Sequence, residues 1–170
     1  VEDLARLIGA AEIQAAAHRP GTPTAAAIMS TNLITVKANT DLGEVADLFR
    51  RHRFTSLPVV DEKQRFLGII FQVHLISRAR EDALRLDRGL IPALRRLIDP
   101  ERDKPVLAID IMSVTVPRAI ATTPLGALLP LLGDTDVDAV PILEYGKLIG
   151  IVTRTDLIAA MARGIARAEV

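Results

Sequence analysis

The sequence contains no cysteine and no tryptophan, and aromatic residues make up only 3% of its 170 positions. Without cysteine, the chain can form no disulfide, thiolate metal site or cysteine nucleophile. Its formal net charge is zero, whereas a nucleic-acid binder normally concentrates basic residues on one face to displace phosphate counterions. No apolar run approaches the roughly 20 residues that cross a bilayer, and no signal-peptide pattern opens the chain. We therefore expect no nucleic-acid partner and no membrane span within these residues.

What the chain does have is a large apolar fraction, 49% of its residues, and an internal repeat. Three short motifs occur twice in the same order: an Ile-Met-Ser triplet, a hydrophobic run containing proline, and a glycine between aliphatic residues. The copies are Ile28-Met29-Ser30 and Ile111-Met112-Ser113, Leu57-Pro58-Val59-Val60 and Val140-Pro141-Ile142-Leu143, and 66–70 and 147–152. Such self-similarity indicates one unit that stacks against its twin to bury its apolar face. We therefore look for function between the two copies.

Hydrophobic periodicity predicts the order strand, helix, strand, strand, helix in each copy. In the first copy we expect strands at 33–36, 56–60 and 66–71, with helices that begin near Asp41 and Gln72. In the second copy we expect a helix from Pro124, a hairpin of 139–143 and 147–153, and a final helix from Thr153 or Arg154. The predicted fold is α/β (α+β), with two pseudo-symmetric repeats that each contain a small three-stranded sheet and two helices.

These elements divide the chain into a leader (1–24), a first repeat (25–79), a helical linker (80–105) and a second repeat (106–170). Helical spacing of apolar residues predicts an amphipathic helix over 3–17 in the leader. A second amphipathic helix is expected in the linker and should end before Asp99-Pro100, because the residue before a proline avoids the helical conformation. The start at valine rather than methionine is expected for a piece of a longer polypeptide, and processing of the chain would produce the same start.

The motifs and their spacing resemble a tandem pair of cystathionine-beta-synthase (CBS) domains over residues 25–162. The resemblance rests on the Ile-Met pair, the Leu-Pro-Val-Val-Asp segment, the Leu-Gly-Ile segment and a closing Thr-x-x-Asp-Leu. It implies a flat disc, called a Bateman module, that commonly dimerises and binds adenosine-containing ligands between its repeats. The expected ligands are AMP, ADP, ATP and S-adenosylmethionine, and no further cofactor is required.

A second, weaker resemblance concerns the parent protein. The leader helix, the long basic linker and Asp103-Lys104-Pro105 are similar to the carboxy-terminal region of HPP-family membrane proteins. That family joins a helical membrane domain to a CBS pair. The resemblance implies that this chain is a cytoplasmic regulatory tail attached to a membrane domain.

The candidate site lies at Thr153-Arg154-Thr155-Asp156, where a buried strand runs into the first turn of a helix. Amides at a helix start, the Thr153 hydroxyl and the helix dipole can all favour a phosphate. Asp156 can accept hydrogen bonds from both ribose hydroxyls. The CBS resemblance assigns these roles to the matching Thr and Asp, places the backbone of Val140-Pro141 beside the adenine, and puts Leu33-Ile34 on the opposite wall.

A run of acids before this site, Asp134, Asp136 and Asp138, would repel a polyphosphate. Either Arg154 and a metal ion such as Mg²⁺ offset this charge, or the ligand is less negative, as AMP, adenosine and S-adenosylmethionine are. The spacing also resembles half of a calcium loop, but Ala139 and Tyr145 stand where that loop needs glycine and glutamate. We therefore expect no metal site built by the protein itself.

One alternative interpretation and one difference between the repeats bear on this site. Thr153 could simply cap the final helix, with Asp156 as a favourable charge in its first turn. In the first repeat the matching positions are Phe71 and His74, which cannot reproduce the donor and the carboxylate. We therefore expect the equivalent cleft of the first repeat to be empty, or to be filled by Phe71.

Catalysis finds no support in the sequence. His18, His52 and His74 fall on different elements, and no Gly-rich phosphate loop or metal-ligand spacing occurs. The segment Arg50-Arg51-His52-Arg53 is interpreted as a solvated helix end, with a phosphate-facing rim as its alternative. The sequence therefore predicts a non-enzymatic regulatory module, and the alternative is a ligand-free structural dimerisation module.

Overall fold

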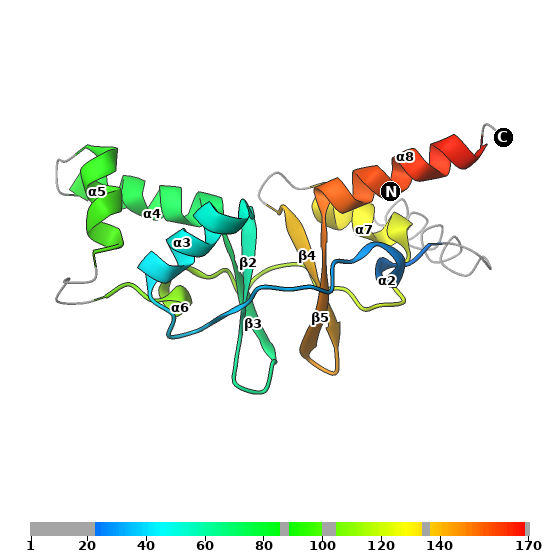
Figure 1. The fold of residues 1–170 in the computed structure, drawn as a ribbon, viewed down its shortest axis with the longest axis horizontal. Helices are drawn as coiled ribbons and strands as arrows, with labels where there is room; N and C mark the ends of the chain where they lie inside the picture. Colours follow the sequence, from blue (N-terminus) through cyan, green and yellow to red (C-terminus); the bar gives the residue numbers. More distant parts are fainter. Residues whose placement is uncertain (1–22, 86–88, 100–104, 134–136, 169–170) are drawn as a thin grey trace, which may run out of the picture. The chain divides into compact units, whose positions relative to one another are not determined.

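The computed structural model describes residues 23–85, 89–99, 105–133 and 137–168. The fold is mixed α/β, as predicted, and it separates into two compact units (Figure 1). Unit 1 combines Val1–Leu33 with Pro117–Val170, and unit 2 is Ile34–Val116. The leader helix expected over 3–17 lies outside the described residues.

Unit 2 is built on a three-stranded sheet with the order β1-β2-β3. Its strands are β1 (Val36–Lys37), β2 (Ser56–Val60) and β3 (Phe66–Phe71). The first strand runs parallel to β2, and β2 and β3 form an antiparallel hairpin. The bounds of β2 and β3 match the predicted strands. The first strand is later and shorter than the predicted 33–36, because only Val36 and Lys37 find partners on β2.

The helices of unit 2 begin where local chemistry places them. They are α3 (Leu42–His52), α4 (Gln72–Arg85), α5 (Leu90–Leu97) and α6 (Ala108–Ile111). Asp41 caps α3, since its carboxylate accepts the Gly43 N–H at 2.7 Å. The linker helix α5 ends before Asp99-Pro100, as predicted, and packs on α4 with Ala93 and Leu97 buried.

The core of unit 2 lies between its sheet and α3. Leu57, Val59 and Ile70 from the sheet are buried together with Val45 and Phe49 from α3. Fully burying one such side chain stabilises the folded state by about 1.5–3 kcal/mol. The apolar face predicted for the helix that begins at Asp41 is therefore the face that covers the sheet.

Unit 1 contains the second hairpin and its covering helices. Its elements are α2 (Ala25–Ile28), α7 (Leu125–Leu132), β4 (Ala139–Glu144), β5 (Lys147–Thr153) and α8 (Arg154–Ala168). Helices α7 and α8 pack on each other and on the hairpin (Figure 1). Pro124 is the N-cap of α7 rather than its first helical residue.

The sheet of unit 1 has two strands rather than the three that we expected. The third strand is reduced to one parallel bridge between Ala119 and Ile142. There the Ala119 N–H donates to the Pro141 carbonyl at 3.1 Å, and its carbonyl accepts the Leu143 N–H at 2.8 Å. Pro117, two residues earlier, has no N–H with which to extend the ladder.

Each Ile-Met-Ser triplet packs on the hairpin of the other sequence repeat. In unit 1, Ser30 and Ile151 exchange backbone hydrogen bonds of 2.9 and 3.1 Å. A Cβ atom at Gly150 would collide with the Met29 sulfur and lie 2.9 Å from its Cγ atom. The glycine in this motif is therefore needed for the close approach of the methionine.

Unit 2 has the same arrangement with the two repeats reversed: the triplet comes from the second repeat and the hairpin from the first. Ser113 and Ile69 share backbone hydrogen bonds of 2.8 and 3.0 Å. A Cβ atom at Gly68 would lie 2.8 Å from the Ser113 carbonyl oxygen and 3.0 Å from the Met112 sulfur. The motifs that recur together in the sequence thus contact the motifs of the other copy, and each unit needs residues from both repeats.

Candidate ligand-binding site

The junction between β5 and α8 is closed by reciprocal hydrogen bonds between Thr153 and Asp156. The Asp156 carboxylate accepts the Thr153 N–H at 2.8 Å, and the Thr153 hydroxyl oxygen accepts the Asp156 N–H at 3.2 Å. The same hydroxyl donates to Asp156 Oδ2 at 2.7 Å. This is a capping box, which satisfies amides that the first turn of a helix leaves unpaired. Thr153 and Asp156 therefore do cap the final helix, which is the alternative role that the sequence offered for them.

Capping does not exhaust the hydrogen-bonding capacity of Asp156. The two carboxylate bonds described above both fall on Oδ2, whereas an ionised carboxylate offers about four acceptor sites on its two oxygens. Asp156 and Thr153 are both half-buried rather than sealed in the core. The box therefore orients the carboxylate and leaves Oδ1 as an acceptor for a further donor.

Val140 and Pro141 lie in β4, opposite Val152 and Ile151 of β5. Both side chains are fully buried. They pack within unit 1, so only their backbone atoms are suited to border a ligand.

The predicted wall residues Leu33 and Ile34 fall in different units. Leu33 is the last residue of the first segment of unit 1, and Ile34 is the first residue of unit 2. Ile34 is half-buried against the core of unit 2. The other predicted site residues, Thr153, Arg154, Asp156, Val140 and Pro141, all belong to unit 1.

Arg154 is held by two segments that precede it in unit 1. Its Nε donates to the Leu132 carbonyl at the end of α7 at 3.0 Å, and its Nη1 lies 3.6 Å from Asp138 Oδ1. The Arg154 N–H also donates to the Asp138 carbonyl, at 3.3 Å. Sequence reasoning named Asp138 only as a repelling acid and did not identify this pair. The hairpin register could have indicated it, because Ala139 pairs with Thr153 and so brings their neighbours together.

The first repeat closes its equivalent junction with an aromatic pair. The Phe71 ring is only 2% exposed, as expected for a side chain that fills space. Its N–H donates to His74 Nδ1 at 3.3 Å, and the two rings meet edge to face with centroids 5.2 Å apart. Burial lowers the pKa of His74 below its usual 6.5, against the opposing effect of a backbone hydrogen bond with Ile111. His74 therefore takes the capping position of Asp156 as a neutral ring.

The position of Arg154 also has a neutral counterpart. Gln72 begins α4 and donates from Nε2 to the Phe54 carbonyl at 2.6 Å. Its N–H donates to the Thr55 carbonyl at 3.0 Å, as that of Arg154 does to Asp138. The two repeats thus share a backbone plan, with Gln72 and Thr55 where the second repeat has a cation and an acid.

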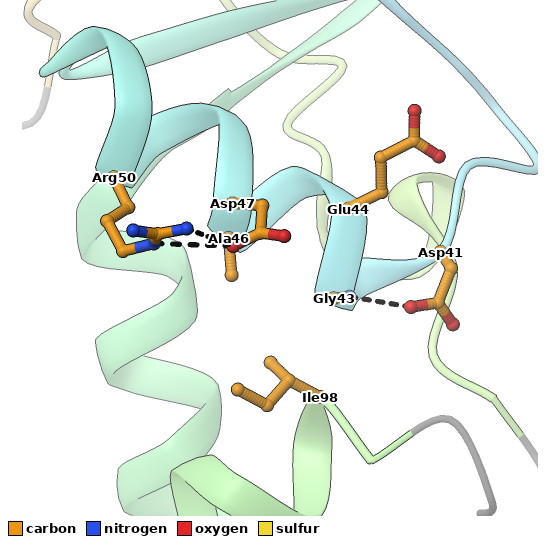
Figure 2. A pocket seen from close by; sticks show the side chains of 7 residues that line it. All are labelled: Asp41, Gly43, Glu44, Ala46, Asp47, Arg50 and Ile98. Carbon is orange, nitrogen blue, oxygen red and sulfur yellow. Dashed lines mark hydrogen bonds and ion pairs between the residues drawn. The ribbon is translucent and has the colours of Figure 1, made fainter.

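Unit 2 has an open hollow beside α3, shown in Figure 2. It is lined by Asp41, Gly43, Glu44, Ala46, Asp47, Arg50 and Ile98. Asp41 is engaged in capping Gly43, and Asp47 accepts from Arg50 Nη2 at 3.1 Å. None of the predicted site residues lines this hollow, and we interpret it as the solvated face of a helix.

The basic end of α3 is solvated, as predicted. Arg50 and Arg51 both reach back to Asp47, at 3.1 and 3.7 Å, with all three side chains more than half exposed. His52 stacks on Phe54 with ring centroids 5.2 Å apart. Arg53 ends the helix in the left-handed conformation, with φ of 54°. These contacts are local, and none of them involves a predicted ligand-binding residue.

Among the described residues, no group of three or more His, Cys, Asp or Glu side chains is arranged to hold a metal ion. Within the same residues, no helix is both long enough and apolar enough to cross a membrane.

The chain belongs to the CBS domain family. The family profile, described as "CBS domain", matches twice, over residues 25–81 and 108–163. These matches coincide with the duplicated motifs and together cover more than half of the chain. The protein is therefore a tandem CBS pair.

Solved structures of CBS pairs resemble this fold. CBSX2 from Arabidopsis thaliana is 27% identical, with a TM-score of 0.67 and coverage of 86% of this chain and 98% of that one. CBSX2 in complex with AMP is 25% identical, with a TM-score of 0.64 and coverage of 82% and 96%. The CBS pair of protein MJ0100, in complex with 5'-methylthioadenosine and S-adenosyl-L-methionine, is 23% identical, with a TM-score of 0.60 and coverage of 82% and 99%. At that identity the last likeness shows the fold alone.

Two curated relatives are larger proteins. The uncharacterized protein MJ1404 of Methanocaldococcus jannaschii is 23% identical over 140 residues, and the A-adding tRNA nucleotidyltransferase of Geobacter sulfurreducens is 29% identical over 144 residues. The matches cover 79% and 85% of this chain but only 31% and 14% of the relatives. The chain thus spans less than a third of either relative.

Proposed function

We propose that this CBS pair is a non-catalytic regulatory module that binds an adenosine-containing ligand and passes a change of shape to an attached or associated protein. The observation that carries the proposal is the Thr153–Asp156 pair, which places a hydroxyl and an oriented carboxylate at a helix start in only one of the two repeats. CBSX2, which has been solved with AMP, supports the ligand class. AMP is therefore the first candidate, followed by ADP, ATP and S-adenosylmethionine.

The chemistry of the junction suits a nucleoside phosphate. The positive end of α8 favours the phosphate group. The Thr153 hydroxyl has a single proton, which goes to Asp156 Oδ2 in the protein without ligand, so in this proposal it turns from Asp156 to donate to the phosphate. Asp156 Oδ1 accepts from the ribose hydroxyls, while Oδ2 keeps the helix capped. The backbone of Val140-Pro141 borders the adenine in this proposal, with Leu33-Ile34 on the other side. Mg²⁺ would accompany only a polyphosphate ligand and would be held chiefly by its phosphates.

A ligand regulates only if it prefers one shape of the module over another. Coupling free energies between sites are typically about 1–3 kcal/mol, and they can arise only from a difference in affinity for the two shapes. We therefore expect a response that changes the partner's equilibrium by about 5- to 150-fold rather than an all-or-none switch.

Calorimetric titration with AMP, ADP, ATP and S-adenosylmethionine tests the proposal. Replacing Asp156 with alanine should make the binding free energy of the ligand less favourable by about 1.5–3 kcal/mol, the range for a hydrogen bond to a charged group. Because alanine also removes the helix cap, Asp156→Glu is the matched control: glutamate keeps the capping box and the charge but moves the carboxylate. His74→Ala makes the corresponding change in the repeat that lacks the site.

The ribose assignment predicts loss of affinity in both Asp156 variants and unchanged affinity in His74→Ala. If Asp156→Ala binds as tightly as the natural chain while its circular dichroism stays unchanged, the assignment is wrong. If Asp156→Glu restores full affinity, the residue acts through the cap rather than on the ribose.

The second candidate function is a ligand-free dimerisation module. Its supporting observation is that α4 exposes Val73 and Ile76, at 49% and 57%, and α8 exposes Ile158 and Met161, at 66% and 48%. Apolar side chains in such positions favour a homodimer around a two-fold axis. Light scattering that shows a stable dimer, together with silence from all four ligands, would favour this function.

The parent protein remains a proposal. We propose that the module is part of a larger protein, as its coverage of only 31% and 14% of the curated relatives suggests. The membrane attachment and cytoplasmic location predicted from the HPP resemblance rest largely on residues outside the described ranges. Membrane fractionation of the protein expressed from its complete gene would test both.

A further inference from the structure

We propose that the Asp138–Arg154 ion pair sets the charge of the ligand that this site accepts, so that adenosine ligands with at most one phosphate bind better than ATP. This inference rests on the proposed function, because it concerns the ligand of the same site. It assigns a specificity role to Asp138, which neither the family match nor the Thr153–Asp156 pair implies.

The pair lies directly beside the capping box. Arg154 is the first residue of α8, between Thr153 and the rest of the first turn. Its guanidinium reaches away from that turn, to the Leu132 carbonyl at 3.0 Å and to Asp138 at 3.6 Å. A cation next to a helix start would ordinarily attract phosphates. Here the cation is directed to the carboxyl end of α7, where the helix dipole favours positive charge.

Asp138 cancels the charge of Arg154 at the site. The two side chains are 42% and 38% exposed, so water screens the pair only in part. Together they add no net charge beside Thr153. Each phosphate after the first adds negative charge that this surrounding does not offset. Affinity should therefore fall from AMP to ADP to ATP when Mg²⁺ is absent.

The first repeat shows that the fold does not need an ion pair at this place. Gln72 and Thr55 make the corresponding backbone contact, 3.0 Å long, and the Gln72 amide reaches a backbone carbonyl just as Arg154 does. A neutral pair therefore closes the same strand-to-helix junction. The charged pair occurs in the repeat that carries Thr153 and Asp156, which is where ligand charge matters.

This comparison supplies the test. Asp138→Thr and Arg154→Gln each install the residue of the first repeat and shift the local charge by one unit, in opposite directions. The double variant restores neutrality with the neutral pair. Each protein is titrated calorimetrically with adenosine, AMP, ADP, ATP and S-adenosylmethionine at fixed ionic strength without Mg²⁺, and circular dichroism checks its fold.

We expect the natural chain to bind AMP more tightly than ATP. Asp138→Thr should raise the ratio of ATP affinity to AMP affinity on the order of tenfold, and Arg154→Gln should lower it on the order of tenfold, because one unit charge near the phosphates changes. The double variant should return the ratio to that of the natural chain. Affinity for uncharged adenosine should change little in any variant.

Three outcomes would overturn the inference. An ATP-to-AMP ratio that is the same in all four proteins would mean that the pair does not influence ligand charge. A parallel loss of affinity for every ligand, adenosine included, would mean that the pair is only a structural tie. If the natural chain binds none of the five ligands, the proposed function fails and this inference fails with it, whereas the first two outcomes leave the proposed function standing.

Discussion

The β5–α8 junction of unit 1 and the β3–α4 junction of unit 2 have the same backbone plan but are closed by different chemistry. In unit 1 the N–H of the residue before the helix donates to the Asp156 carboxylate at 2.8 Å. In unit 2 the corresponding N–H donates to the His74 ring at 3.3 Å. Both contacts cap a helix, so both junctions meet the same structural need.

The two caps differ in the hydrogen-bond acceptors that remain available for a ligand. A carboxylate that uses one oxygen for capping keeps the second oxygen as an acceptor. The His74 ring uses Nδ1 as an acceptor and is engaged in a backbone hydrogen bond with Ile111, so it has no second acceptor for a ribose. Phe71 then buries an apolar ring where Thr153 has a hydroxyl. One repeat therefore uses this junction for stability, and the other keeps polar atoms accessible.

The largest expected effect concerns Phe71. Phe71→Ala should lower the free energy of unfolding by about 3–5 kcal/mol, because truncating a buried aromatic residue leaves a cavity. Thr153→Ala, its counterpart, should cost about 1 kcal/mol through loss of a helix cap. Urea denaturation of both variants measures the difference. Equal losses of stability in the two variants would show that the Phe71 ring contributes no more to folding than the Thr153 cap does.

The two motif glycines should differ in their tolerance of alanine. At Gly68 the new Cβ atom would lie 2.8 Å from a backbone carbonyl, whereas at Gly150 its nearest neighbours all belong to the flexible Met29 side chain. Overpacking typically lowers stability by about 1–3 kcal/mol. The loss of stability should therefore lie near the upper end of this range for Gly68→Ala and near the lower end for Gly150→Ala. Gly126→Ala, with open space around it, is the control for the substitution itself. A greater loss at Gly150 would contradict this order.

The His74 cap predicts a pH dependence of the stability of the folded chain. Burial lowers the pKa of His74 in the folded chain below 6.5, so the unfolded chain binds more protons as the pH falls through about 6.5. His74 therefore reduces stability progressively as the pH falls from about 7 through its folded pKa, and has no such effect at higher pH.

Denaturation midpoints of the natural chain and of His74→Gln, measured between about pH 7.5 and pH 5, isolate this contribution. Glutamine can accept the Phe71 N–H without titrating. The stability of the His74→Gln variant should therefore change less with pH over this interval than that of the natural chain. Parallel curves would show that protonation of His74 does not oppose folding.

The smallest expected effect concerns the turns of the two hairpins. Tyr145 and Gly146, between β4 and β5, have φ of 50° and 78°. The backbone of a two-residue type I′ turn favours asparagine over tyrosine at the first position. Tyr145→Asn should therefore raise the free energy of unfolding by about 0.5 kcal/mol, a fraction of the roughly 1–2 kcal/mol that the left-handed conformation costs most residues.

Tyr145 is 97% exposed, so its replacement removes no packing. The turn of the first hairpin is held differently, by Asp61, whose carboxylate accepts the N–H groups of Lys63 and Arg65, each at 2.9 Å. Asp61→Asn should be destabilising under the same conditions in which Tyr145→Asn is stabilising. A destabilising Tyr145→Asn would show that the side chain makes an unrecognised contact.

Much of the local structure of this chain could be predicted from short stretches of residues. Alternating and continuous apolar runs placed β2, β3 and β5 at the bounds that the structure has. Asp41 before an apolar periodicity indicated the start of α3, and Asp99-Pro100 indicated the end of the linker helix. These predictions succeed because strand alternation, capping and proline chemistry depend on neighbours a few residues apart.

The candidate site was predictable in composition but not in arrangement. Thr153 and Asp156 were identified from the CBS resemblance and from their place where a strand runs into the last helix, and their mutual capping follows from a spacing of three residues. The pairing of Arg154 with Leu132 and Asp138 was not foreseen, because it joins segments 22 and 16 residues away along the chain. Such contacts depend on how α7 packs beside the hairpin, which no local pattern encodes.

By itself, the sequence determined that the protein is a duplicated α/β chain, where most of its elements begin and end, and that only the second copy carries a hydroxyl and a carboxylate at the strand-to-helix junction. The tertiary structure alone decided that Met29 packs on Gly150 and Met112 on Gly68, so that the hairpin of each repeat contacts the methionine of the other repeat. It also decided that Arg154 forms an ion pair with Asp138. The physical reason is that local elements follow from the covalent neighbourhood, whereas these contacts require chain segments far apart in sequence to fit together.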